Sequence, residues 1–241
     1  MFGTKLLLIT LLSMYSLRVF PADKLTLITY SEVPFATQEG NNKKGLVIEF
    51  INALFKQTDL EYDIVFLPLK RGMSMAESDL NTCVLPIERN QHREVHYTWI
   101  GPVMISRYGL FSVDQSQPQL ASLSDAKLAS IGSFLGSGIG EYLTHFGYQV
   151  DLTNNDNLNV KKLQRGRIDF WAADLVSAKA IMADNDADFG EPKIIFFTSI
   201  RAMACHIDLQ VETQNKLNHA LLHLYKSGYM AELHQKYGLA L

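Results

Sequence analysis

Cysteine is scarce in this 241-residue chain, which contains only Cys83 and Cys205. The two residues lie far apart and neither belongs to a CxxC motif, so they do not indicate a metal site. Both lie in apolar, strand-like runs, TCVLPI and AMACHI. They are either two buried thiols or, in an oxidising compartment, a disulfide between neighbouring strands. The sequence leaves both alternatives open.

The chain also lacks an excess of positive charge. It has 22 Lys and Arg against 25 Asp and Glu, a formal net charge of −3, and no basic cluster. A dedicated nucleic-acid-binding protein usually carries a basic patch, so we expect no nucleic-acid partner. Hydrophobic residues make up 47% of the chain and charged residues 20%. This balance is typical of a globular protein and excludes a disordered chain or a polytopic membrane protein.

Motifs of several enzyme classes are absent as well, namely G-x-S-x-G, H-E-x-x-H and the GK[ST] ending of a phosphate-binding loop. His219 and His223 have i, i+4 spacing, but a metal site needs further ligands, and an exposed helix face explains them better. We therefore expect no cofactor, no metal and no catalytic activity. The alternative is a carboxylate such as Glu32 or Glu88 acting as a general acid, if burial raises its pKa.

Long apolar runs are confined to the N-terminus. Lys5 precedes the apolar run Leu6–Leu17, which is too short to span a bilayer comfortably. This order predicts a secretory signal peptide over residues 1–22, cleaved after Ala22; the alternative is an uncleaved anchor. No cysteine lies near the cleavage region to carry a lipid. We therefore expect a protein exported to the periplasm.

Candidate strands and helices alternate along the rest of the chain. Apolar residues at helical spacing indicate helices, and short apolar runs bounded by turn residues indicate strands. Strands are predicted over 24–30, 62–68, 82–87, 128–134, 148–153, 168–175 and 201–207, and helices over 46–55, 71–80, 138–147, 157–166, 176–184, 212–228 and 230–238. The repeated βαβ order predicts an α/β protein with parallel strands in two lobes.

One charged residue in each half could meet a ligand of opposite sign. Arg93 lies in the stretch 81–102 and Asp174 in the stretch 163–175. Arginine is shaped for bidentate capture of a carboxylate, so the pair suits a small zwitterion held between two lobes. As alternatives, Arg93 is a solvated charge beside Glu94, and Asp174 caps the helix that follows it.

The same two stretches resemble the family-3 periplasmic solute-binding proteins, the amino-acid-binding components of ABC importers. The family's first-lobe motif has Asp, Thr, Arg, aromatic and Pro positions. Arg93, Trp99 and Pro102 take the last three, and Asn81 and Asn90 stand where the Asp and the Thr would be. The second-lobe motif L-x-x-G-R-I-D-A-x-x-x-D is matched at Leu163, Gly166, Arg167, Ile168, Asp169 and Asp174. The ending LYKSGYMAELHQKYG is also similar to that of the family. The resemblance covers nearly all of the chain after the signal peptide.

The resemblance implies the type II periplasmic-binding-protein fold, with two α/β lobes joined by two hinge strands and the ligand in the cleft. Residues 23–103 and 199–241 would form the first lobe and residues 104–198 the second. The protein would be a monomer that captures a small polar ligand, such as an amino acid, for an ABC permease in the inner membrane. Alternatives are a sensor module for a membrane receptor and, less favoured, a dehydratase-like enzyme on the same fold.

Departures from the family pattern leave the ligand open. Members that bind basic amino acids have small hydroxyl residues where this chain has Leu85, Pro86 and Glu88. Glu32 stands where an aromatic residue usually stacks on the ligand. We expect Pro86, Glu88 and Glu32 to contact the ligand.

The remaining candidate contacts come from three other segments. Leu69 and Arg71 resemble part of a P-W-K-R motif found in a subgroup of the family. Gly136, Ser137 and Gly138 precede a helix, whose free N–H groups can receive a carboxylate. Trp171 either lines the cleft or fills the core of the second lobe.

Overall fold

The computed structural model describes residues 24–116 and 118–239, so the predicted signal peptide lies outside the described residues. The strands are β1 (Leu25–Thr29), β2 (Thr37–Glu39), β3 (Asn42–Lys44), β4 (Tyr62–Phe66), β5 (Thr82–Glu88), β6 (Tyr97–Phe111), β7 (Ser130–Phe134), β8 (Gln149–Thr153), β9 (Phe170–Asp174) and β10 (Ile194–His206). The helices are α1 (Leu46–Phe55), α2 (Leu69–Ser78), α3 (Gly138–His145), α4 (Asp156–Gln164), α5 (Leu175–Asp184), α6 (Val211–Lys226) and α7 (Tyr229–Lys236), with a 3₁₀ turn η1 (Leu123–Ala126).

Eight strands form one continuous sheet in the order β4-β1-β5-β10-β6-β9-β7-β8. Strand β1 is parallel to β4 and β5, and β7 is parallel to β8 and β9. The central strands β10 and β6 are antiparallel to each other and join the two parallel parts. The expected α/β architecture is therefore confirmed, with a separate hairpin of β2 and β3 added.

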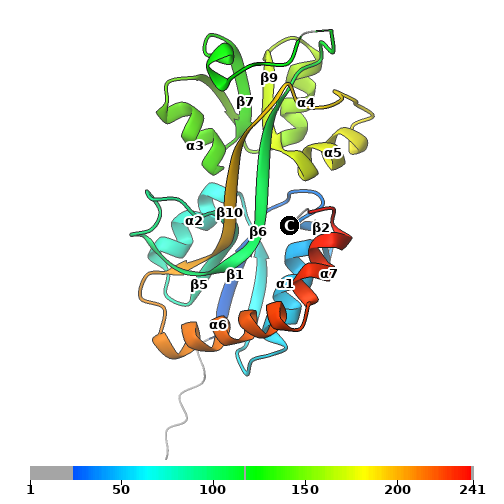
Figure 1. Ribbon diagram of the computed structural model, residues 1–241. Helices are drawn as coiled ribbons and strands as arrows, with labels where there is room; N and C mark the ends of the chain where they lie inside the picture. Colours follow the sequence, from blue (N-terminus) through cyan, green and yellow to red (C-terminus); the bar gives the residue numbers. More distant parts are fainter. Residues whose placement is uncertain (1–23, 117, 240–241) are drawn as a thin grey trace, which may run out of the picture.

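Two lobes are joined by the long strands β6 and β10 (Figure 1). We call the part with β1, β4, β5, α1, α2, α6 and α7 lobe 1, and the part with β7, β8, β9, α3, α4 and α5 lobe 2. The predicted lobe borders, at 103/104 and 198/199, fall inside β6 and β10 and stay predictions.

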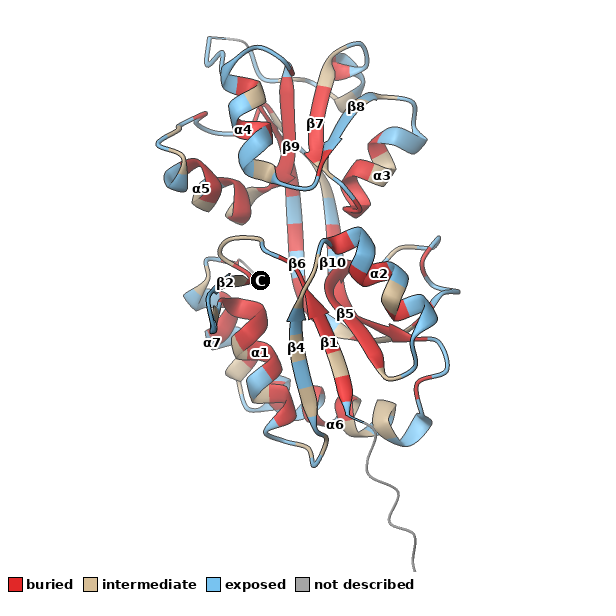
Figure 2. Ribbon diagram, turned by 180° about the vertical axis from the view of Figure 1, so that it is seen from behind, coloured by how far each residue is buried: buried red, intermediate tan, exposed pale blue. Residues whose placement is uncertain are grey.

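Each lobe has its own hydrophobic core. In lobe 1, apolar residues of α1 such as Leu46, Phe50 and Leu54 are fully buried against β1, β5 and the C-terminal helices. In lobe 2, Trp171 of β9 and Val160 of α4 are fully buried in the main cluster. Figure 2 shows buried residues along β5 and β9, whose residues are all buried. Strands that are covered on both faces read as continuous apolar runs.

A disulfide joins Cys83 of β5 to Cys205 of β10. The two residues face each other in the antiparallel register of these strands. The disulfide alternative is therefore the correct one. Among the described residues, no helix combines the length and the apolar composition needed to cross a bilayer.

Candidate functional site

A small cavity lies between the lobes, at the strand ends of both. Lobe 1 and the joining strands contribute Tyr30, Glu32, Glu88, Tyr108 and Arg201, and lobe 2 contributes Phe134, Ser137, Ile139, Asp156, Ala172, Ala173, Asp174 and Ser177. The cavity measures about 20 Å³, which is room for about one water molecule. Charged side chains from both lobes thus converge on one water-sized space.

Arg201 of β10 is the central cation of this cavity, and its side chain is only 1% exposed. Its Nη2 lies 2.6 Å from Glu32 Oε2, and its Nη1 lies 3.3 Å from Glu32 Oε1. It also donates to the Tyr30 hydroxyl and, at 3.2 Å, to the Pro86 carbonyl. Burial lowers the pKa of Arg201, but Glu32, Tyr30, Tyr108 and Glu88 together outweigh it, and the net pKa lies well above the usual value. Arg201 is therefore charged, and both of its Nη atoms donate to partners, whereas its buried Nε has none among the described residues.

Glu88 at the end of β5 is buried and accepts a hydrogen bond of 2.6 Å from the Tyr108 hydroxyl. Burial raises its pKa, but Arg201 and Arg93 together lower it further, so the net pKa is below the usual 4.5. Glu88 is therefore ionised at neutral pH and does not suit the role of a general acid. Gly138 of lobe 2 packs so closely on Glu88 that an added Cβ would lie 2.9 Å from its side chain.

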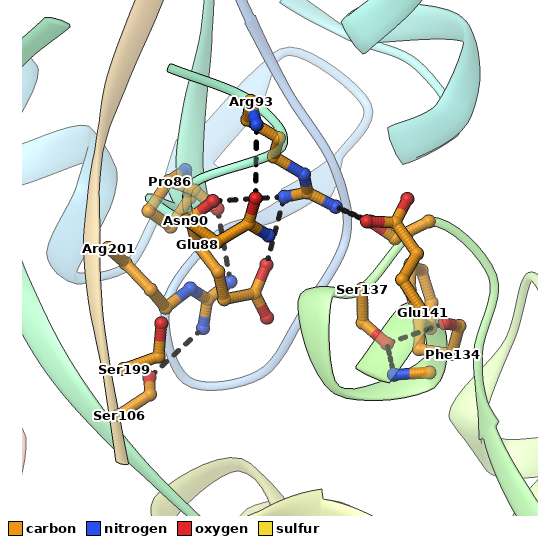
Figure 3. Close-up of polar contacts among 12 residues, drawn as sticks. Pro86, Glu88, Asn90, Arg93, Ser106, Phe134, Ser137, Glu141, Ser199 and Arg201 are labelled. Carbon is orange, nitrogen blue, oxygen red and sulfur yellow. Dashed lines mark hydrogen bonds and ion pairs between the residues drawn. The ribbon is translucent and has the colours of Figure 1, made fainter. Parts of the chain in front are cut away.

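Arg93 connects the lobes beside the cavity rather than lining it (Figure 3). Its guanidinium donates to the Glu88 carbonyl at 3.1 Å within lobe 1. Across the interface it donates to the Gly136 carbonyl at 2.9 Å and to Glu141 Oε2 at 2.7 Å. Arg93 is 4% exposed, so it is not the solvated charge of the alternative interpretation. Its contact with a ligand stays a prediction.

Asp174 lies both at the start of helix α5 and beside the interlobe cavity, the two places that the sequence suggested. Its Oδ1 accepts from the backbone N–H groups of Val176 at 3.0 Å and Ser177 at 2.9 Å, which caps α5. The same side chain lines the cavity and is 3% exposed. Burial, with the Glu32 charge nearby, raises its pKa from 3.8 to about 6. Asp174 is thus a capping residue whose carboxylate also faces the interlobe space.

Asp156, at the start of α4, belongs to the cavity but was missed in the sequence. Its Oδ1 accepts from the Trp171 indole at 3.0 Å and from Asn159 at 2.8 Å. Burial raises its pKa from 3.8 to about 6. Trp171 itself is fully buried in the core of lobe 2 and reaches the cavity only through Asp156. The run NNDN before an apolar helical pattern was the available signal.

The other predicted contacts are spread over the interface. Leu69 is buried in the core of lobe 1 and Arg71 is exposed on α2, and neither lines the cavity. Ser137 caps α3 and lines the cavity.

The histidine pair of α6 matches the expectation from its spacing. His219 and His223 are both exposed on α6. Within residues 24–116 and 118–239, no three His, Cys, Asp or Glu side chains are placed to hold a metal ion.

The raised pKa of Asp174 predicts a pH-dependent stability. The folded state binds this proton more tightly than the unfolded chain, so stability falls as pH rises from about 4 to about 6. From about pH 7 to about pH 5, this group should add about 1 kcal/mol to the unfolding free energy. Urea titrations of wild type and Asp174→Asn at both pH values measure the difference. Equal pH dependence in both proteins would contradict the assignment.

Comparisons with known proteins find similar solved structures but no similar sequences. No model of a protein family and no curated protein matches the sequence. A solved ancestral arginine-binding protein bound to arginine is 19% identical, with a TM-score of 0.75 over 89% of this chain and 97% of the other. A histidine kinase sensor domain with similarity to periplasmic binding proteins is 17% identical, with a TM-score of 0.81 over 89% and 96%.

A third similar solved structure is of a protein named as the precursor of an enzyme. It is an ancestral amino-acid-binding protein described as a precursor of cyclohexadienyl dehydratase. It is 16% identical, with a TM-score of 0.75 over 89% of this chain and 94% of the other. These identities establish the fold and leave the ligand open. The chain has the two-lobe fold of the periplasmic binding proteins, as its resemblance to the family-3 solute-binding proteins implied.

Proposed function

We propose that this protein is a periplasmic solute-binding protein, which captures a small polar ligand between its lobes and delivers it to an ABC importer. The observation that carries the proposal is the interlobe cavity, lined by Glu32, Glu88 and Arg201 on one side and Asp156 and Asp174 on the other. Such a site assembles only when the lobes meet, so a solute that contacts both lobes favours the closed state. The proposal includes export, action as a monomer, and no catalytic step.

The second candidate function is a ligand-binding sensor that reports to a membrane receptor. It is favoured by the likeness to the histidine kinase sensor domain, at a TM-score of 0.81. Both functions need the same cavity and the same closure. Genes for a permease and an ATPase beside this gene would favour the importer, whereas a receptor kinase gene would favour the sensor.

A solute screen tests the binding function shared by both candidates. The purified protein without residues 1–22, unfolded and refolded to remove bound solute, is melted with amino acids, amines, organic acids or small peptides. A solute at 100 times its Kd should add about 2.7 kcal/mol of stability, which appears as a clear rise in Tm. Calorimetric titration of each hit then gives the Kd. If no solute of any class raises Tm, the binding function is rejected.

A further inference from the structure

The interlobe site is strongly acidic. Four carboxylates line the cavity, from Glu32, Glu88, Asp156 and Asp174, together with one cation, Arg201. A groove of about 190 Å³ shares Glu32, Phe134 and Asp156 with the cavity and adds the carboxylate of Asp184. No Lys, Arg or His lines this groove. The cavity and the groove adjoin at these shared residues, and their linings together carry an excess of negative charge.

The two arginines of the interface are already bound to carboxylates. Arg201 is held by both oxygens of Glu32, and Arg93 is held by Glu88 and Glu141. Each guanidinium keeps only its Nε–H without a partner, so neither presents a free pair of N–H donors to the carboxylate of a solute. By contrast, Asp156 and Asp174 accept only from neutral donors, namely N–H groups and, for Asp174, the Ser106 hydroxyl, and neither belongs to an ion pair of the described residues. The unpaired charge of the site is negative.

The size of the cavity favours a single small cationic group. At about 20 Å³, the cavity suits a group of about the size of a water molecule, and a primary ammonium is such a group. The head of an α-amino acid carries an ammonium and a carboxylate on one carbon and needs more room. The carboxylate would also face Asp174, which costs energy through like-charge repulsion.

The groove suits an alkyl chain that leads away from this ammonium. Val33, Phe134 and Ile181 line it beside the carboxylates of Asp156 and Asp184. At the junction with the cavity, the rings of Tyr30 and Phe134 stack across the lobes with centroids 5.7 Å apart. Aromatic faces attract organic cations. The groove thus offers apolar surface for an alkyl chain among polar and acidic side chains, which fits a chain that carries more than one cationic group.

We propose that the solute is an aliphatic diamine or guanidino-amine without a carboxylate, with one ammonium beside Asp174 and Asp156 and its chain in the groove toward Asp184. This inference rests on the proposed solute-binding function. It names the class of solute and excludes free amino acids as the preferred ligands. In this arrangement Arg93 joins the lobes and does not hold the anionic end of a ligand.

Two matched pairs of solutes test the proposal. Agmatine is arginine without its carboxylate, and cadaverine is lysine without its carboxylate. Calorimetric titration of the refolded protein should give a Kd for agmatine or cadaverine at least about tenfold lower than that of its amino acid, a difference of about 1.4 kcal/mol. Equal or tighter binding of arginine or lysine overturns the proposal, as does a preference for glutamate.

Two conservative variants locate the ammonium, with a third as control. Asp174→Asn can still cap α5, and Asp156→Asn retains an oxygen that can accept from Trp171. Each should weaken binding of the preferred diamine by at least about tenfold, because a buried cation loses its charged partner. Asp151→Asn removes an exposed lobe 2 carboxylate that pairs with Lys162, and its Kd should equal that of wild type. Unchanged binding in folded Asp156→Asn and Asp174→Asn variants overturns the placement and with it the proposal.

The same measurements separate this inference from the proposed function. If a neutral or anionic solute binds and no diamine does, the solute class is wrong and the solute-binding function stands. If no solute of any class binds, both are rejected.

Discussion

Replacing Arg201 with methionine is expected to lower the unfolding free energy by about 3–5 kcal/mol, because it removes one partner of a buried ion pair. The substitution leaves the carboxylate of Glu32, whose side chain is 15% exposed, without its cation. It also removes a positive charge that lowers the pKa of Glu88. Urea denaturation without solute at about pH 7 measures the loss.

Two further proteins show whether the loss comes from unpaired charge. The double variant Arg201→Met, Glu32→Gln removes both partners and should recover part of the stability, since replacing a whole buried pair is less costly than breaking it. Arg71→Met removes an exposed arginine of lobe 1 and should change stability by less than about 0.5 kcal/mol. A loss in Arg201→Met no larger than in Arg71→Met would contradict the buried-pair interpretation.

Removing the disulfide is the second substitution with a large expected effect. Cys83 and Cys205 are 122 residues apart in sequence, and a link across a long loop restricts the unfolded chain strongly. The double variant Cys83→Ala, Cys205→Ala should therefore lose about 2–5 kcal/mol of unfolding free energy. The measurement is urea denaturation of both proteins, with and without a thiol reductant.

The reductant supplies the control for this prediction. Wild type should become less stable in reductant once its disulfide is broken, while the double alanine variant should not respond. If both proteins have equal stability without reductant, the link does not stabilise the fold. Both cysteines are fully buried, so complete reduction has to be verified by thiol titration in denaturant.

Local patterns predicted most of the elements. The apolar spacing over 46–55 predicted α1 with its observed ends, and the run TCVLPI predicted β5 to within one residue. The segment 97–111 was predicted only in part, as the end of a motif and as a hinge strand implied by the family resemblance, yet it forms the fifteen-residue strand β6. β10 begins at Ile194 and not at the predicted 201. These strands continue through both lobes, so their length is fixed by pairing with each other and not by a local apolar run.

The candidate site was only partly predictable for a related reason. Glu32, Glu88 and Asp174 were predicted contacts, and all three line the cavity. Arg201 belongs to the run RAMACHI, which was predicted to be a strand. No functional role was predicted for Arg201. Its partner Glu32 is 169 positions away. Sequence reveals a charged residue within a strand, but the fold decides which distant carboxylate meets it.

Arg93 gives the closed arrangement interlobe bonds that involve no solute, to the Gly136 carbonyl and the Glu141 carboxylate. A solute can shift the balance of open and closed molecules only by its difference in affinity for the two. The bonds of Arg93 therefore increase the fraction of molecules that are closed without solute. The further increase in the closed fraction that a solute can cause is then smaller. The Glu141 side chain is 41% exposed, so salt weakens this bond. A membrane partner that recognises the closed state would also bind molecules that are closed without solute, and this solute-independent binding should decrease as ionic strength increases.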